Sequence, residues 1–316
     1  MPKLSFTKMQ AIGNDYVYFN CFDQETYKLL ISPSQLAITL PDARFSAADD
    51  DATVILPLSV GPLAITLSDR HFGVGGDGVV LILPPENPGK ADAKMSMYNA
   101  DGSEGKMCGN AIRCVAKFLY DNRIVDKTTL CIETLSGNKT LILTIENGLV
   151  SSVKVDMGQA ILNPKEIPVN LEGESAIARE VEIGGTYYEI NCVSMGNPHA
   201  VVFCKEDIAG LNLAEIGPKF ENNPMFPDRV NTEFVEVLSR NSLKMRVWER
   251  GSGETLGCGT GACAAAVAAV LNGFCDKNTD IKVLLPGGEL TICYTDETVF
   301  MTGGAEKVFD GYIAYD

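Results

Sequence analysis

The chain has 316 residues, which is enough for two domains of ordinary size. Its composition, 46% hydrophobic and 21% charged residues, is typical of a soluble globular protein. The net charge of −15 disfavours a nucleic-acid partner, because no basic patch offsets the phosphates. The N-terminus lacks the apolar region of a signal peptide and no apolar run reaches transmembrane length, so we expect a cytoplasmic protein without membrane contact.

Cysteine usage points to reduced thiols. The chain has ten cysteines but no CxxC pair, and only two histidines, His71 and His199. This spacing does not fit a Cys/His zinc site, so we expect no metal centre. Thiols in a chain without an export signal favour a reducing compartment.

The first half of the chain is rich in predicted strands. Residues 4–20 indicate a strand, a turn at Gly13-Asn14-Asp15 and a second strand. A short helix is expected within 31–40, starting near Ser34, and one or two short strands within 53–67. Further strands are predicted at 79–83, 94–99, 130–134 and 139–145. The glycine-rich segment DRHFGVGGDG (69–78) is followed by a strand without Lys-Ser/Thr, which excludes a P-loop.

The second half repeats this composition. Strands are predicted at 149–157, 186–193, 200–203, 231–238, 242–249, 281–285, 289–294 and 298–302. The segment 262–271 has no polar side chain except Cys263, which predicts a helix buried on every side. Cys258 would then lie at a helix N-terminus, where free N–H groups and the helix dipole favour negative charge and can lower the pKa of a thiol.

The stretch around Cys258 has a counterpart 150 residues earlier, around Cys108. Each copy is a polar, glycine-rich loop, then Cys-Gly, then a mostly apolar helix, and each half also carries a Gly-Asn and an Asp-Arg pair in the same order. We therefore predict an α+β fold with two pseudo-symmetric domains, each a curled, mainly antiparallel sheet around a central helix. The expected boundaries are 1–135 and 136–302, with 303–316 returning to the first domain.

Two thiols in matching positions can form a disulfide, bind a soft metal or act on opposite faces of one substrate carbon. The third use exploits the symmetry, because one group removes a proton and the other delivers one, and the roles exchange in the reverse reaction. Two helix N-termini aimed at a substrate carboxylate would stabilise the developing enolate.

Six stretches of the chain resemble the diaminopimelate epimerase family, a cofactor-independent, two-cysteine class. They span nearly the whole chain in the family's order: KMQAIGNDY (8–16), DRHFGVGGDG (69–78), YNADGSEGKMCGNAIRC (98–114), GNPHAVVF (196–203), NTEFVEV (231–237) and ERGSGETLGCGTGACA (249–264). The related proline racemases also have two cysteines, but the GND, YNADGSE and ERGxGET elements favour the epimerases.

The resemblance implies epimerisation of L,L-diaminopimelate to the meso isomer in lysine biosynthesis, without pyridoxal phosphate or metal, in the cleft between the domains. It implies that Cys108 and Cys258 are the acid/base pair. Backbone N–H groups for the reacting carboxylate would come from Gly109, Asn110, Gly259 and Thr260. Substrate contacts would come from Asn14, Asn99, Asn197, Asn231, Glu249 and Arg250. Arg250 and neighbouring asparagines would bind the distal carboxylate, Glu249 an ammonium group, and His199 would lie close to the thiols.

The chain departs from the family pattern in four places. Gln10-Ala11 replaces His-Gly, Gly78 replaces a substrate-contacting Gln of some members, Met107 replaces a frequent Gln, and the region 21–67 is longer than usual. Two alternatives stay open, a racemase of another amino acid with the same thiols and a non-enzymatic redox or metal-binding thiol protein. The oligomeric state, including a homodimer, is also open.

Overall fold

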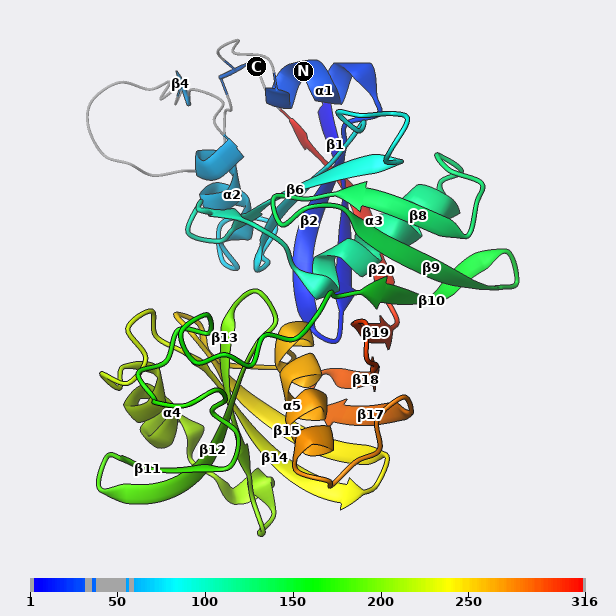
Figure 1. Cartoon of the computed structure of the whole chain (residues 1–316). Coiled ribbons are helices and arrows are strands. Elements are labelled where there is room, and N and C mark those ends of the chain that lie inside the picture. Colours follow the sequence, from blue (N-terminus) through cyan, green and yellow to red (C-terminus); the bar gives the residue numbers. More distant parts are fainter. Residues whose placement is uncertain (1–2, 32–35, 38–54, 57–59, 315–316) are drawn as a thin grey trace, which may run out of the picture. The chain divides into compact units, whose positions relative to one another are not determined.

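The computed structural model describes residues 3–31, 36–37, 55–56 and 60–314 (Figure 1). The chain divides into two compact units. Unit 1 comprises Met1–Lys139 and Ala305–Asp316, and unit 2 comprises Thr140–Gly304. No helix within the described residues is long and apolar enough to cross a membrane.

Unit 1 begins with the predicted hairpin. Strands β1 (Lys3–Ala11) and β2 (Asn14–Asn20) pair antiparallel. The two residues between them, Ile12 and Gly13, have φ of 50° and 82°, the backbone that suits a two-residue hairpin turn. The turn therefore places Asn14 at the first position of β2.

The remaining strands of unit 1 extend this hairpin into a sheet. They are β5 (Gly78–Leu83), β6 (Ala93–Asn99), β7 (Glu104–Gly105), β8 (Thr129–Glu133) and β20 (Glu306–Ala314). β2 pairs parallel with β5, β5 antiparallel with β6, and β6 antiparallel with β7 and parallel with β8, while β20 pairs antiparallel with β1. A separate pair is formed by β3 (Leu36–Ala37) and β4 (Ile55–Leu56).

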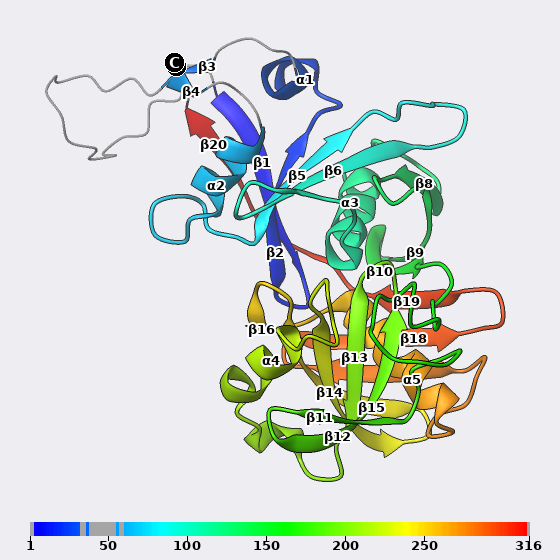
Figure 2. The ribbon, with the colours of Figure 1, turned by 60° about the vertical axis from the view of Figure 1, so that its left-hand side comes forward.

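Three helices lie within the described residues of unit 1, and two of them were not predicted. Helix α1 (Gln24–Ile31) precedes the helix that we predicted within 31–40, most of which lies outside the described residues. We predicted one or two short strands within 53–67; the described part of this range contains the short strand β4, followed by the unpredicted helix α2 (Val60–Ser68). Its buried residues Val60, Leu63, Ala64 and Leu67 have the i, i+3, i+4, i+7 spacing of one helix face. The third helix is α3 (Gly109–Asp121), which packs against β1 and β2 (Figure 2).

Unit 2 contains the sheet predicted for the second half. Its strands are β9 (Lys139–Glu146), β10 (Leu149–Asp156), β11 (Arg179–Ile183), β12 (Thr186–Ser194), β13 (Pro198–Phe203), β14 (Asn231–Ser239), β15 (Ser242–Glu249), β16 (Gly253–Thr255), β17 (Asp280–Leu285), β18 (Gly288–Tyr294) and β19 (Val299–Gly303). The 3-10 helix η1 (Ile208–Gly210) and helix α4 (Leu213–Glu221), which the sequence analysis missed, lie between β13 and β14 in the chain.

Helix α5 (Gly259–Leu271) occupies the core of unit 2, as its composition predicted. It packs against strands on several sides, including β12, β13, β14 and β18 (Figure 1). Every residue from Gly261 to Ala269 is buried. The side chains are mostly alanine, so strands can approach the helix closely from all of these directions.

The two units repeat one plan. The series β1, β2, β5, β6, β7, α3, β8 in unit 1 matches β12, β13, β14, β15, β16, α5, β17 in unit 2, with the same parallel or antiparallel sense at each strand pairing. Both helices have 13 residues. The predicted α+β fold of two pseudo-symmetric, mainly antiparallel domains around central helices is confirmed.

Candidate active site

Cys108 and Cys258 each cap the N-terminus of the central helix of their unit. Both have extended backbones, with φ and ψ of −132° and 121° at Cys108 and −114° and 114° at Cys258. The sulfur of Cys108 accepts a hydrogen bond from the backbone N–H of Ala111 at 3.5 Å, and that of Cys258 from Gly261 at 3.4 Å. Each thiol therefore occupies the position of a side-chain N-cap, where unpaired N–H groups of the first turn favour negative charge.

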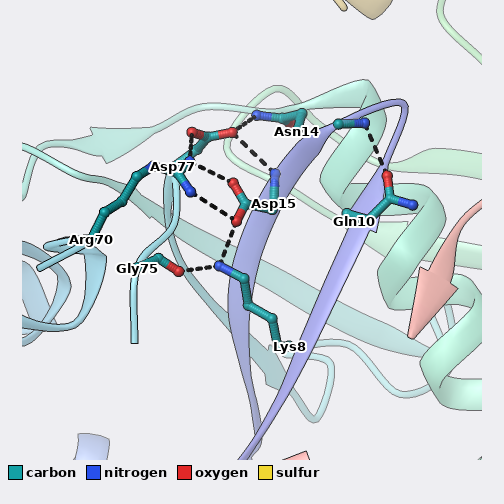
Figure 3. A network of polar contacts seen from close by, with 8 residues as sticks. Lys8, Gln10, Asn14, Asp15, Arg70, Gly75 and Asp77 are labelled. Carbon is teal, nitrogen blue, oxygen red and sulfur yellow. Dashed lines mark hydrogen bonds and ion pairs between the residues drawn. The ribbon is translucent and has the colours of Figure 1, made fainter. Parts of the chain in front are cut away.

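In unit 1, Asn14 links the thiol of Cys108 to a charged network. Figure 3 shows this network around Asn14, Asp15 and Asp77. The Cys108 thiol donates to Oδ1 of Asn14, with sulfur and oxygen 3.4 Å apart. Nδ2 of Asn14 donates to Asp77 at 2.7 Å. Because a carboxylate only accepts, this contact fixes which end of the Asn14 amide faces the sulfur.

The network around Asp77 ties the β1–β2 hairpin to the glycine-rich segment before β5. Arg70 bridges Asp15 and Asp77, at 2.8 and 3.0 Å, and the buried Lys8 pairs with Asp15 at 2.7 Å. Burial works to raise the pKa of Asp15, but hydrogen bonds and charge from Arg70 and Lys8 outweigh it and hold this pKa below its ordinary value. Gln10, a departure from the family pattern, accepts from the N–H of Gly13 and supports the hairpin turn.

Unit 2 presents a longer chain of hydrogen bonds to its thiol. Nδ1 of His199 lies 2.7 Å from Oε1 of Glu233, and Nε2 lies 3.0 Å from Oδ1 of Asn197. Nδ2 of Asn197 donates to Oγ1 of Thr260 at 3.3 Å, and this hydroxyl lies 3.5 Å from the sulfur of Cys258. We call these five residues the Glu233–Cys258 chain. His199 and Glu233 are fully buried.

The pKa of Cys258 is raised well above its ordinary value. Burial is the largest cause, and the carboxylates of Glu249 and Glu233 add to it, whereas the Thr260 hydroxyl and the Gly261 N–H work to lower it. The net direction is the reverse of the lowering that a helix N-terminus alone would produce.

The other residues singled out in the sequence lie close to these elements. Asn231 begins β14 and accepts from the backbone N–H of Arg250 at 3.0 Å, while the Arg250 guanidinium donates to the carbonyl of Asp228 at 2.8 Å. Glu249 ends β15 and accepts from the Thr255 hydroxyl.

Two of the predicted residues in unit 1 have local partners. Asn110 in the first turn of α3 accepts from Arg113 at 3.1 Å. Asn99 ends β6, and its described side-chain contact is with Ser103 in the following turn. The structure therefore connects Asn14 with Cys108, and the described side-chain hydrogen bonds of Asn99 and Asn110 are to Ser103 and Arg113.

Sequence analysis missed Asp77 and Glu233. Glu233 could have been identified from the sequence, because it lies two residues from both Asn231 and Val235 and therefore shares their face of β14. A carboxylate on the buried face of a strand requires a partner, and His199 supplies it. Among the described residues, no group of three or more His, Cys, Asp or Glu side chains could hold a metal ion.

The family model of diaminopimelate epimerase matches residues 46–163 and 191–308. The chain is 48% identical to the diaminopimelate epimerase of Acetivibrio thermocellus, covering 98% of each chain, and 49% identical to that of Agathobacter rectalis, covering 98% of this chain and 99% of the relative.

Solved structures share the fold at low identity. A probable proline racemase from Agrobacterium radiobacter K84 matches with a TM-score of 0.65 at 14% identity, covering 99% of this chain and 93% of that one. A hydroxyproline epimerase from Agrobacterium vitis matches with a TM-score of 0.63 at 12% identity, covering 99% and 91%. The matches of the family model to both halves, and relatives of nearly half-identical sequence over almost the full length, show that this chain belongs to the diaminopimelate epimerase family.

Proposed function

We propose that this protein interconverts L,L- and meso-diaminopimelate, a step of lysine biosynthesis, with Cys108 and Cys258 as the acid and base. The observation that carries the proposal is the pair of cysteines that cap equivalent buried helices in a member of this family. One thiolate removes the α-proton and the other thiol delivers a proton to the opposite face. Both proton transfers use the chain's own sulfurs, so the reaction needs neither pyridoxal phosphate nor metal.

The carbanion next to the substrate carboxylate is the costly intermediate. The N–H groups of the first helical turns, at Gly109, Asn110, Gly259 and Thr260, are the donors that we propose for this carboxylate. They carry the partial positive charge of a helix N-terminus and would stabilise the charge that develops on the enolate oxygens.

We further propose that Asn14, Asn99, Asn197, Asn231, Glu249 and Arg250 bind the rest of the substrate. Arg250 suits the distal carboxylate, because its planar guanidinium can donate two parallel hydrogen bonds. None of the ten cysteines, all of which lie within the described residues, is in a disulfide, which supports our proposal of a reducing, cytoplasmic location.

The test is proton NMR of L,L-diaminopimelate with the reduced protein in D₂O. We expect the α-proton signal to disappear as the meso isomer forms, and Cys108→Ala and Cys258→Ala each to abolish epimerisation. Full turnover by either variant would refute the two-thiol mechanism.

A second candidate, racemisation of another amino acid, draws on the fold shared with a probable proline racemase and a hydroxyproline epimerase. It predicts α-proton exchange with a substrate that has one carboxylate. A panel of amino acids in the same assay separates the two candidates.

A further inference from the structure

Equivalent asparagines of the two units present opposite ends of their amides toward the thiols, Asn14 directly to Cys108 and Asn197 through Thr260 to Cys258. Asn14 and Asn197 both follow a glycine and stand at the same place in the repeated plan, next to β2 and β13. In unit 1, Nδ2 of Asn14 donates to Asp77, so Oδ1 of Asn14 faces the Cys108 thiol and accepts from it. In unit 2, Oδ1 of Asn197 faces Nε2 of His199, so Nδ2 of Asn197 donates to the Thr260 hydroxyl next to Cys258.

The direction of the unit 2 chain follows from the orientation of the Asn197 amide, whose Nδ2 faces the Thr260 hydroxyl and whose Oδ1 faces His199. A carboxylate facing Nδ1 anchors the ring of His199, and Nε2 then faces the amide oxygen of Asn197, which can only accept. With the Asn197 amide in this orientation, Nε2 is the donor of the contact with Oδ1. Because the Thr260 hydroxyl accepts from Nδ2 of Asn197, its own hydrogen is available to the sulfur of Cys258.

The described side-chain hydrogen bond of Glu233 is the one with Nδ1 of His199. Its carboxylate is fully buried, and Oε2 has no hydrogen-bond partner among the residues that the structure describes. The equivalent position of unit 1, taken from the pairing of Tyr16 with Gly78 and of His199 with Asn231, is the apolar Val80. The repeated plan thus does not require an acid here, and a buried carboxylate without full hydrogen bonding is costly.

We propose that Glu233 is a positioning residue that, through His199 and Asn197, turns the Thr260 hydroxyl toward the sulfur of Cys258 and so stabilises its thiolate during turnover. The inference rests on the proposed role of Cys258 as an acid and base. Such a donor is needed because burial opposes ionisation of this sulfur. The charge of Glu233 works to raise the pKa of Cys258, and the hydrogen bond from the Thr260 hydroxyl works to lower it.

Two isosteric variants test the route from Glu233 to the sulfur. Glu233→Gln removes the anchor of His199, and Thr260→Val removes the hydroxyl while keeping the backbone N–H. We expect each to lower kcat about 10- to 100-fold, the usual effect of losing a supporting partner of a reactive group, with KM nearly unchanged. The double variant should be no slower than the slower single variant, because both changes break one chain.

The matched control is Glu236→Gln, which changes the same residue type on the same strand and should retain wild-type kcat. Losses that multiply in the double variant, or wild-type kcat in Glu233→Gln, would overturn the inference. So would loss of kcat in Thr260→Val with no loss in Glu233→Gln.

NMR of the wild-type protein with ¹⁵N-labelled histidine tests the direction of the chain without relying on activity. The chain has only two histidines, and His71→Gln removes the exposed one, which assigns the His199 signals. We expect a proton on Nε2 of His199. A bare Nε2 would overturn the inference even if Glu233→Gln failed to fold. Absence of turnover in the wild-type protein would instead count against the proposed function.

Discussion

Gly261 lets Glu233 approach the first turn of α5, and replacing it with alanine tests how much that approach matters. A Cβ at this position would lie 2.6 Å from Oε1 of Glu233, whereas ordinary van der Waals contact begins at 3.4 Å. The carboxylate would have to retreat by about 0.8 Å. Since Oε1 lies 2.7 Å from Nδ1 of His199, a retreat directly away from the ring would lengthen their contact to about 3.5 Å, beyond the usual range of a hydrogen bond.

We therefore expect Gly261→Ala to lower kcat about 10- to 100-fold, because misplacement of a supporting group by about 1 Å costs up to this much. The free energy of unfolding should fall by at most about 3 kcal/mol. Alanine improves helix propensity by up to about 1 kcal/mol, and the forced contact costs about 1 to 3 kcal/mol. The assays are steady-state epimerisation and urea unfolding.

Gly210→Ala is the control, because a Cβ there meets no heavy atom within 4 Å. The equivalent of Gly261 in unit 1 is Ala111, so the repeated helix tolerates a Cβ where no carboxylate faces it. Wild-type kcat in Gly261→Ala, with Nε2 of His199 still protonated, would refute the reasoning.

Three further predictions follow from the charges and burial. Asp15→Asn should be less stable than the wild type at pH 7, and the difference should shrink below about pH 4. The pKa of Asp15 is lower in the folded protein than the unfolded value of about 3.9, so its charge stabilises the fold above that pH, and this contribution is lost as the pH falls through the folded pKa. Urea midpoints at pH 7 and pH 3 measure this, and a constant difference would contradict it. Arg250→Leu should lower kcat/KM for diaminopimelate about 100-fold, since two charge-assisted hydrogen bonds are lost, and a loss below about 3-fold would remove Arg250 from substrate binding. Burial raises the pKa to about 12 at three thiols, which should resist iodoacetamide at pH 8 in the native protein but not in urea: Cys21, Cys114 and Cys192. Peptide mass spectrometry measures the labelling, and rapid native alkylation of these thiols would contradict their burial.

The sequence predicted the parts of the fold that depend on local pattern. The apolar run 262–271 indicated a buried helix, and the offset of 150 residues between Cys108 and Cys258 indicated the repeated plan. Both are confirmed. Helix α2 was missed, because a short apolar run such as 60–67 fits a buried strand as well as a helix.

Contacts that depend on strand register were beyond the sequence. Strands β13 and β14 pair in parallel, with His199 next to Asn231. Because Glu233 follows Asn231 by two residues, it lies on the same face of β14 and reaches Nδ1 of His199. Asp77 reaches Asn14 through the parallel pairing of β2 with β5 in the same way. A single sequence shows that these residues are polar but not which strands lie next to each other.

The pairing of β20 with β1 has a consequence for how the protein is made. Unit 2 is one continuous segment of the chain, whereas unit 1 consists of two segments, 1–139 and 305–316, that lie on either side of unit 2 in the sequence. During synthesis, β1 can pair at once with β2, but its other edge has no partner until residues 306–314 leave the ribosome. An unpaired strand edge invites association with other chains. Unit 2 can therefore complete its sheet first, and removal of the last ten residues should leave unit 1 prone to aggregation.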